Sequence, residues 1–201
     1  MPNVFLVSDT HFGHEKTCSV FKREDGSPLR PFANAAEMDE VMVQRWNETV
    51  NPHDKVYHLG DVAMGKKALP IMSRLNGDKV LIRGNHDIFD VNVYTPYFRD
   101  VRGCHMLDGM FLSHVPIHPE SLHRFGTNIH GHLHANRVKK MRGIDVATGE
   151  ILYSNENDPR YHSVCVELTD FRPISFDDVR QRIRTEGGIV GFNPKKDGPS
   201  M

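Results

Sequence analysis

Three features that often decide the class of a protein are scarce in this chain of 201 residues. Its apolar runs last only a few residues, whereas a membrane-spanning helix needs about 20 consecutive apolar residues. Its cysteines, Cys18, Cys104 and Cys165, are far apart and form no C-x-x-C pair, so neither a disulfide framework nor a cysteine zinc site is expected. Its charge is nearly balanced, with 25 basic and 26 acidic residues, which does not support a protein that binds duplex nucleic acid.

The beginning of the chain also lacks a basic segment followed by a long apolar core, so we expect no secretory signal, no membrane partner and a cytoplasmic location. Hydrophobic residues make up 38% of the chain and charged residues 25%, as in an ordinary globular domain. We assign this domain to residues 1–185. Residues 186–201 are rich in glycine, proline and lysine and are expected to form a flexible tail.

Short apolar runs that end in polar residues recur along the chain and are typical of strands buried on both faces of a sheet. Helical patterns lie between them, the clearest being an apolar stripe from Met38 to Trp46 that follows a capping Asn34. The dipeptide Asp108-Gly109 is typical of a tight hairpin. We therefore expect an α/β domain with a mixed sheet or two packed sheets, with strands at 4–7, 55–59, 79–82, 110–113, 127–130 and 163–168 and further helices at 67–75 and 177–184.

The polar residues that end these runs include many of the chain's 13 histidines. Aspartate, asparagine and histidine are ligands that suit divalent Mn, Fe, Zn or Co. Taken singly, a Gly-Asp pair is usually a turn and a lone histidine is usually part of a core. Together, and each at the end of an apolar run, the five blocks indicate a metal site: Asp9-Thr10-His11, Gly60-Asp61, Gly84-Asn85-His86-Asp87, His114 and Gly131-His132-Leu133-His134.

These blocks, which span residues 9–134, resemble the pattern D-x-H, G-D, G-N-H-D/E, H and G-H-x-H of the calcineurin-like metallophosphoesterases. The stretch from Ser8 to His14 is most similar to the small bacterial and phage members of that superfamily. The resemblance implies two mixed β-sheets packed as a sandwich and flanked by helices. It also implies hydrolysis of phosphoesters.

The resemblance also implies roles for individual residues. One metal would be held by Asp9, His11, Asp61 and His134, and a second by Asp61, Asn85, His114 and His132, so that Asp61 bridges the two. His86 would be the catalytic histidine and Arg83 a phosphate contact. His14 is a candidate for the wall of the substrate pocket, with a supporting or surface role as the alternative. Mn²⁺ is the expected metal, with Fe, Zn, Co or Ni as alternatives.

The charges of the proposed ligands agree with a site for two metal ions. Two divalent ions bring four positive charges, whereas Asp9 and Asp61 supply two negative ones, so a bridging hydroxide leaves about one positive charge for an anionic substrate. The activity that the resemblance implies is that of a dinuclear-metal-dependent phosphodiesterase or phosphatase, in which a metal-bridging hydroxide attacks a small phosphoester, which we expect to be nucleotide-like. A nuclease of the same superfamily and a catalytically silent metal-binding scaffold are the alternatives. The oligomeric state is not predicted.

The sequence departs from the superfamily at one position. Protein Ser/Thr phosphatases carry G-D-x-x-D-R-G, and their second aspartate orients the catalytic histidine, but Met64 stands at that position here. Asp87 is a candidate for holding His86, with capping of the turn at Ile88 as the alternative. We expect the pocket walls at residues 12–33 and 88–103, with stacking or phosphate contacts from Phe12, Phe21, Arg23 and Arg30. Lys139, Lys140 and Arg142 are expected to lie in a solvated charged loop.

Overall fold

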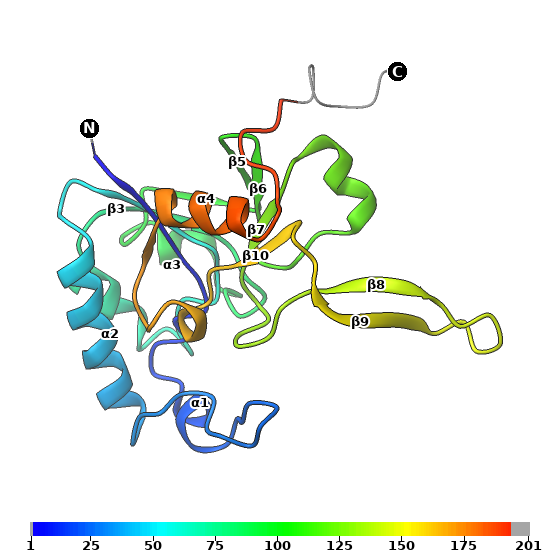
Figure 1. Cartoon of the computed structure of the whole chain (residues 1–201). Coiled ribbons are helices and arrows are strands. Elements are labelled where there is room, and N and C mark those ends of the chain that lie inside the picture. The colour runs from blue at the N-terminus through cyan, green and yellow to red at the C-terminus, as the bar shows by residue number, and fades with distance from the viewer. Residues whose placement is uncertain (1, 194–201) are drawn as a thin grey trace.

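The computed structural model describes residues 2–193, and its larger sheet carries three of the strands that end at the polar blocks (Figure 1). This sheet has five strands in the order β11-β1-β2-β3-β4. Neighbours from β1 to β4 run parallel, and β11 is antiparallel to β1. The strands are β1 (Val4–Val7), β2 (Lys55–His58), β3 (Asp78–Ile82), β4 (Asp100–Arg102) and β11 (Ile174–Ser175).

A second sheet has four strands in the order β10-β7-β6-β5, and it is also mixed. Asp108 and Gly109 join β5 to β6 with φ values of 48° and 75°, as a tight hairpin requires, which confirms the predicted turn. The strands are β5 (His105–Leu107), β6 (Met110–Leu112), β7 (Asn128–His130) and β10 (Tyr161–Ser163). The predicted fold class, two mixed sheets with flanking helices, is confirmed.

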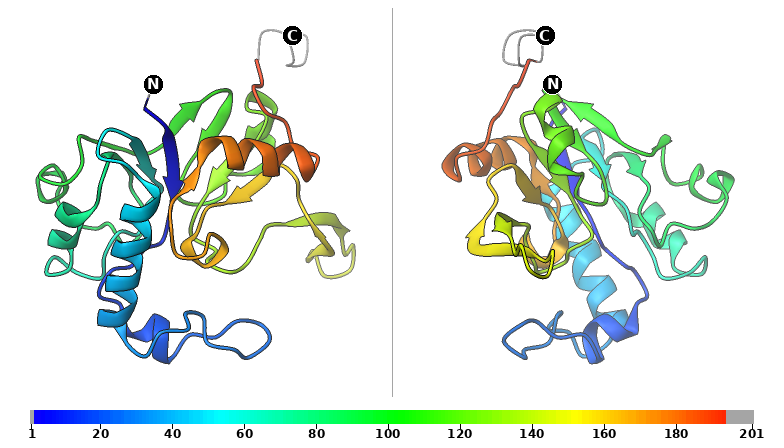
Figure 2. Two further views of the ribbon diagram at one scale, coloured as in Figure 1. Left: turned by 60° about the vertical axis from the view of Figure 1, so that its left-hand side comes forward. Right: turned by 90° about the vertical axis from the view of Figure 1, so that its right-hand side faces the viewer.

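Side chains that alternate along β1 enter two different hydrophobic cores. Leu6 joins Leu112 of β6 and Ile129 of β7 in a core shared by both sheets, which α4 (Phe176–Thr185) also contacts. Phe5 and Val7 belong instead to a second core that contains the apolar stripe of α2 (Ala35–Thr49). Figure 2 shows both helices lying outside the strands. The sheets are therefore fixed relative to each other, and the loops at their strand ends start from a rigid base.

Two predicted elements differ from the structure. The segment expected to be a helix at 67–75 is instead a six-residue 3₁₀ helix over Leu69–Arg74, a form that is common in short connecting segments. The segment expected to be a strand at 163–168 contains the end of β10 and a 3₁₀ helix over Val166–Leu168. That turn brings Glu167 into contact with Arg30. The remaining helices are α1 (Glu15–Ser19), α3 (Val91–Tyr94) and a 3₁₀ helix over Pro119–Arg124.

The segment that was expected to be a charged loop forms a two-stranded hairpin of β8 (Lys139–Ile144) and β9 (Ile151–Asn157). It projects from the body of the protein (Figure 1). The register pairs Met141 with Tyr153 and Ile144 with Ile151, so these four exposed side chains share one face. Register shifts in β8 interrupt the alternation that would identify a strand in the sequence.

The last described residues contact the second sheet. Thr127 Oγ1 donates a hydrogen bond of 2.8 Å to the carbonyl of Ile189. Residues 194–201, which belong to the expected tail, lie outside the described residues, so the domain boundary at 185 stays a prediction. Within residues 2–193, no helix is both long enough and apolar enough to cross a membrane.

Candidate metal centre

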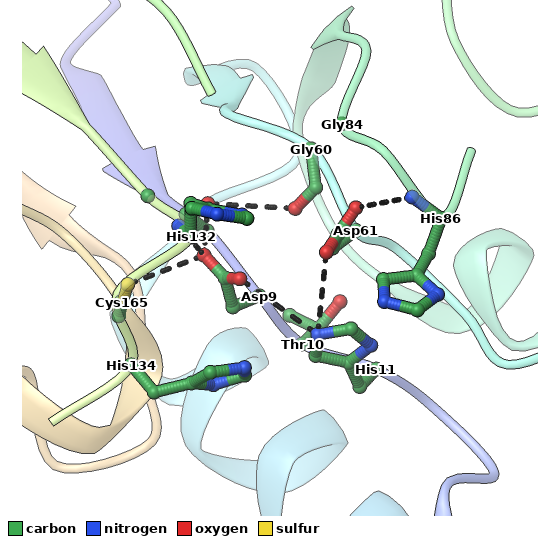
Figure 3. A network of polar contacts seen from close by, with 12 residues as sticks. Asp9, Thr10, His11, Gly60, Asp61, Gly84, His86, His132, His134 and Cys165 are labelled. Atoms are coloured by element: carbon green, nitrogen blue, oxygen red, sulfur yellow. Dashed lines mark hydrogen bonds and ion pairs between the residues drawn. The ribbon is translucent and has the colours of Figure 1, made fainter. Parts of the chain in front are cut away.

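The residues predicted as metal ligands meet at one edge of the packed sheets. Because β1, β2 and β3 are parallel and in register, the residues that follow them emerge side by side. Figure 3 shows Asp9, Asp61 and His11 facing one another, with His86 and His134 on either side. The structure thus brings together Asp9, His11, Asp61, Asn85, His114, His132 and His134.

One group of ligand atoms comes from Asp9, His11 and His134, whose atoms all lie within 4.8 Å of one another. Within residues 2–193, Asp9 Oδ1 and His11 Nε2 are buried without a hydrogen-bond partner. Burying such atoms unpaired is costly, and a cation would relieve that cost. His134 Nδ1 lies 3.0 Å from Glu167 Oε1, which leaves Nε2 as its ligand atom. These residues therefore fit a metal ion.

A second group comprises Asp9, Asp61 and His114. His114 Nδ1 lies 2.7 Å from the carbonyl of Leu59 and donates to it, so the neutral ring presents a lone pair at Nε2. Asn85 Oδ1, itself an acceptor, lies 2.9 Å from His114 Nε2 and 2.9 Å from His132 Nδ1. Three such atoms at this spacing suit a shared cation.

Asp9 is common to both groups, and Asp61 of the second group also lies close to His11 of the first. Asp61 Oδ2 is 3.5 Å from His11 Nε2 and 3.4 Å from His114 Nε2. Burial by itself would raise the pKa of Asp61, but contacts with His114 and the His86 backbone lower it overall. The Asp61 carboxylate is therefore ionised at neutral pH and lies near a histidine nitrogen of each group.

Five of the predicted ligands have a left-handed backbone, which non-glycine residues rarely adopt. The φ values are 59° for Asp9, 47° for His11, 58° for Asp61, 70° for His132 and 51° for His134. Such conformations cost free energy and tend to cluster at functional sites. The sharp turns they make aim consecutive side chains back toward the centre.

Two glycines allow the ligand loops to approach closely. A Cβ added to Gly84 would collide with the carboxylate of Asp61, and one added to Gly131 would collide with the side chains of Ser8 and Asp9. The glycines in the G-N-H-D and G-H-x-H blocks are thus required because the neighbouring loops lie too close together to leave room for a side chain.

Asp87 has neither of the roles considered from the sequence. Its buried carboxylate accepts hydrogen bonds from the backbone N–H groups of Asp61 at 2.8 Å, Val62 at 3.1 Å and Gly84 at 2.8 Å. The carboxylate thus faces the Asp61 loop and leaves His86 unsupported by this residue. No sequence signal identifies this role, because two of its three donors lie about 25 residues away.

Arg30 and Glu167 form a buried ion pair behind the centre that the sequence did not reveal. Glu167 Oε1 accepts from Arg30 Nε at 2.8 Å, and Arg30 also donates to the carbonyls of Asp9 and Thr10. Arg30 and Phe12 are both 0% exposed. The expectation that they contact substrate is therefore wrong, because both are enclosed by the protein.

His86 is exposed, and its ring lies edge-on to that of His11, with 5.3 Å between centroids. Its backbone N–H donates to Asp61 Oδ1 at 2.8 Å, whereas its imidazole makes no hydrogen bond among residues 2–193. Met64 is 45% exposed and offers no polar group in place of the missing aspartate. The position of His86 is therefore set by its loop.

Arg83 and His14, the predicted substrate contacts, lie near this centre. The guanidinium of Arg83 donates to the carbonyls of Asp87 and Phe89, so it braces the loop that carries His86. The ring of His14 lies 5.5 Å from that of His11, and burial, aided by the charges of His11 and Arg30, lowers its pKa to about 4. His14 is therefore neutral at pH 7. Substrate contact by either residue stays a prediction.

Comparison with known proteins finds relatives that are similar in sequence, although no family model matches the chain. The uncharacterised protein MJ1445 of Methanocaldococcus jannaschii is 32% identical over 194 residues, which is 94% of this chain and 96% of that protein. The gene 66 protein of Mycobacterium phage L5 is 32% identical over 92 residues, covering 43% of this chain and 41% of the phage protein.

One solved structure shows the same fold. The protein of unknown function AQ665 from Aquifex aeolicus aligns with a TM-score of 0.63 at 24% identity, covering 90% of this chain and 99% of AQ665. A structure described as a novel archaeal phosphodiesterase covers 76% of this chain and 98% of its own at 16% identity, and its TM-score of 0.38 is too low to bear on activity. The chain shares its fold with AQ665, and the ligand groups described above lie on that fold. Its match to MJ1445 extends over nearly the whole length of both proteins, so the chain belongs to the same family as MJ1445.

Proposed function

We propose that this protein is a metal-dependent phosphoesterase, a phosphodiesterase or phosphatase of the calcineurin-like type that acts on small phosphoesters. The observation that supports this most strongly is the position of Asp61 Oδ2, about equally far from His11 and His114 in two neighbouring ligand groups. An arrangement with one carboxylate between two sets of imidazole and carboxylate ligands suits a pair of divalent ions.

The donor atoms of the two groups favour particular metals. Carboxylate oxygen, amide oxygen and imidazole nitrogen together suit Mn²⁺, with Fe, Zn, Co and Ni as alternatives, and among residues 2–193 neither group includes the sulfur of a cysteine, which would favour a softer ion. Bound divalent ions would supply Lewis-acid activation of water and charge stabilisation at the phosphoryl group. Asp9 and Asp61 supply the negative charge that holds them. The charge left uncompensated attracts an anionic phosphoester.

The remaining residues act on the substrate and on the ligands. His86, exposed beside His11, donates a hydrogen bond to a phosphoryl oxygen or a proton to the leaving oxygen. The Leu59 carbonyl and the Glu167 carboxylate fix the tautomers of His114 and His134, so that the free nitrogen of each ring faces the centre.

The first experiment measures hydrolysis of bis-p-nitrophenyl phosphate and p-nitrophenyl phosphate by chelator-stripped protein, with and without added Mn²⁺. We expect metal-dependent release of p-nitrophenol that falls at least about 100-fold in His86→Ala, the usual cost of removing a hydrogen-bond donor to the charge that develops in the transition state. His53→Ala, at an exposed histidine on another part of the protein, is the matched control and should retain full activity. The diester-to-monoester ratio then distinguishes a phosphodiesterase from a phosphatase.

Calorimetric titration with Mn²⁺ separates the alternatives. Metal binding without turnover of either substrate, with any divalent ion tested, would favour a catalytically silent scaffold. Failure of both metal binding and turnover would overturn the proposal altogether.

A further inference from the structure

A cleft of about 490 Å³ lies beside the metal centre, between the loop of residues 20–29 and the segment 133–136. Its volume is within the range of about 300–1,000 Å³ that is typical of small-molecule sites. His134 lines the cleft and also belongs to the ligand group of Asp9 and His11. A molecule in the cleft is therefore next to the metal centre.

Phe21 lines this cleft and is 42% exposed, whereas Phe5 and Phe12 of the core are at most 7% exposed. Its ring makes an edge contact of 5.7 Å with His14, whose ring in turn lies 5.5 Å from that of His11. Leaving a large aromatic side chain in water forgoes the free energy of burying it. An exposed phenylalanine within two ring contacts of the metal centre is thus placed to stack on a ligand.

The loop that carries Phe21 is held in shape by its own hydrogen bonds. The backbone of Arg23 donates to Ser27 at 2.9 Å and that of Leu29 donates to Phe21 at 2.8 Å, and Lys22 pairs with Pro28. The buried Arg30 follows directly and anchors the end of the loop. The ring of Phe21 is therefore presented on a preorganised loop, which lowers the entropy cost of binding.

The charges along the cleft favour an anion. Lys22 and Arg23 outnumber Glu24 among the charged residues that line it. Leu29 and Leu133 add apolar surface. The cleft thus combines a flat aromatic ring, aliphatic walls and positive charge, which is the combination that a nucleotide requires.

From this arrangement we infer that the cleft is the base subsite of a nucleoside phosphoesterase, in which Phe21 stacks on the base while the phosphate lies at the metal centre. This inference rests on the proposed function and names the class of its substrate. The nucleoside, as the group retained on phosphorus, extends from the metal centre past His134 into the cleft.

The test compares two diesters that share one leaving group, thymidine 5′-(p-nitrophenyl phosphate) and methyl p-nitrophenyl phosphate. In each, water attacks phosphorus and p-nitrophenol leaves, with thymidine 5′-phosphate or methyl phosphate as the other product. The ratio of the two kcat/KM values therefore isolates the contribution of the nucleoside. We expect the wild type to prefer the thymidine ester by about tenfold or more, the usual worth of one base stacked on an aromatic ring.

Substitution of Phe21 supplies the decisive comparison. Phe21→Ala should bring the ratio close to one, and Phe21→Trp should restore it, because the indole offers a stacking face of its own. Tyr153→Ala removes an exposed aromatic side chain on the β8–β9 hairpin and should leave the ratio unchanged. A wild-type ratio near one, or an equal ratio in Phe21→Ala, would overturn the subsite while the phosphoesterase stands.

A measurement that needs no turnover keeps the two proposals separate. Calorimetry in the His86→Ala background compares binding of thymidine 5′-monophosphate with that of methyl phosphate. Tighter binding of the nucleotide that is lost on adding Phe21→Ala supports the subsite even if neither diester is cleaved. Equal binding of the two ligands would overturn it.

Discussion

The carboxylate of Asp87 accepts a hydrogen bond from the backbone N–H of Asp61, 2.8 Å away, and so joins the two loops that carry Asp61 and His86. The same carboxylate accepts from Val62 and Gly84, so three backbone donors depend on one side chain. The left-handed backbone of Asp61, at a φ of 58°, is held in place by these bonds. Asp87 thus positions Asp61, the proposed bridging ligand, through the backbone.

Replacing Asp87 should therefore weaken metal binding. In Asp87→Asn the amide NH₂ cannot accept, so at least one buried N–H loses its partner, at a cost of about 1–3 kcal/mol in the free energy of unfolding. We expect the affinity for Mn²⁺ to fall by about 10–100-fold, as when other residues that hold metal ligands in place by hydrogen bonds are removed. Calorimetry and urea denaturation measure the two effects. Asp90→Asn, at an exposed position on the same loop, should change neither.

The buried pair of Arg30 and Glu167 leads to a second prediction. Glu167→Gln weakens the acceptor of the His134 Nδ1 hydrogen bond and leaves Arg30 without its counter-charge. We expect weaker binding of one metal ion, together with a loss of about 3–5 kcal/mol in the free energy of unfolding, as is usual when one partner of a buried pair is removed. Metal titration of the folded variant measures the first effect. Glu150→Gln, at an exposed glutamate, is the control, and equal metal affinity in both variants would refute the role of Glu167.

How well the sequence predicts each part of this site depends on how far apart in the chain the interacting residues lie. Asp9 and His11 come directly after β1, and Asp61 follows soon after β2, so local apolar runs are enough to locate them. Parallel pairing of those strands then brings their ends together. The fold class was predictable for the same reason. Whether the assembled residues act as ligands stays a prediction.

The interactions behind the ligands could not be predicted, because they depend on contacts between distant parts of the chain. Arg30 and Glu167 are 137 residues apart and have no flanking motif. Arg30 was therefore expected to reach the substrate, as an arginine near the pocket often does, although it is fully enclosed. The β8–β9 hairpin was missed for a different reason, since its register shifts disrupt the alternation of apolar residues.

Gly131 gives a third prediction, on the packing of the ligand loops. A methyl group at this position would collide with the side chains of Ser8 and Asp9, so Gly131→Ala must displace Asp9 or the loop that carries His132. We expect a loss of about 1–3 kcal/mol in the free energy of unfolding and weaker Mn²⁺ binding. Gly103→Ala is the matched control, because an added Cβ there meets nothing within 4 Å. Retention of wild-type metal affinity in Gly131→Ala would show that the close approach of the loops is unimportant.

His58 leads to a prediction about pH. It is fully buried, with Nε2 2.9 Å from Thr10 Oγ1, and burial lowers its pKa from 6.5 to about 3. Between these values the unfolded chain binds a proton that the folded protein excludes, so the free energy of unfolding falls as the pH falls, by about 1.4 kcal/mol for each pH unit. Above pH 6.5 the residue is neutral in both states and the effect vanishes.

Urea denaturation of the chelator-stripped protein between pH 7 and pH 5 tests this effect, with His58→Gln as the comparison. Glutamine does not titrate and can still bond to Thr10, so the wild type should lose about 1–2 kcal/mol more than the variant over this range. His53→Gln removes an exposed histidine and controls for the loss of one imidazole. A histidine that stays buried and neutral must make the free energy of unfolding depend on pH. If the free energy of unfolding varied with pH in the same way in the wild type and in His58→Gln, the folded protein would have to open its core and admit a proton at His58.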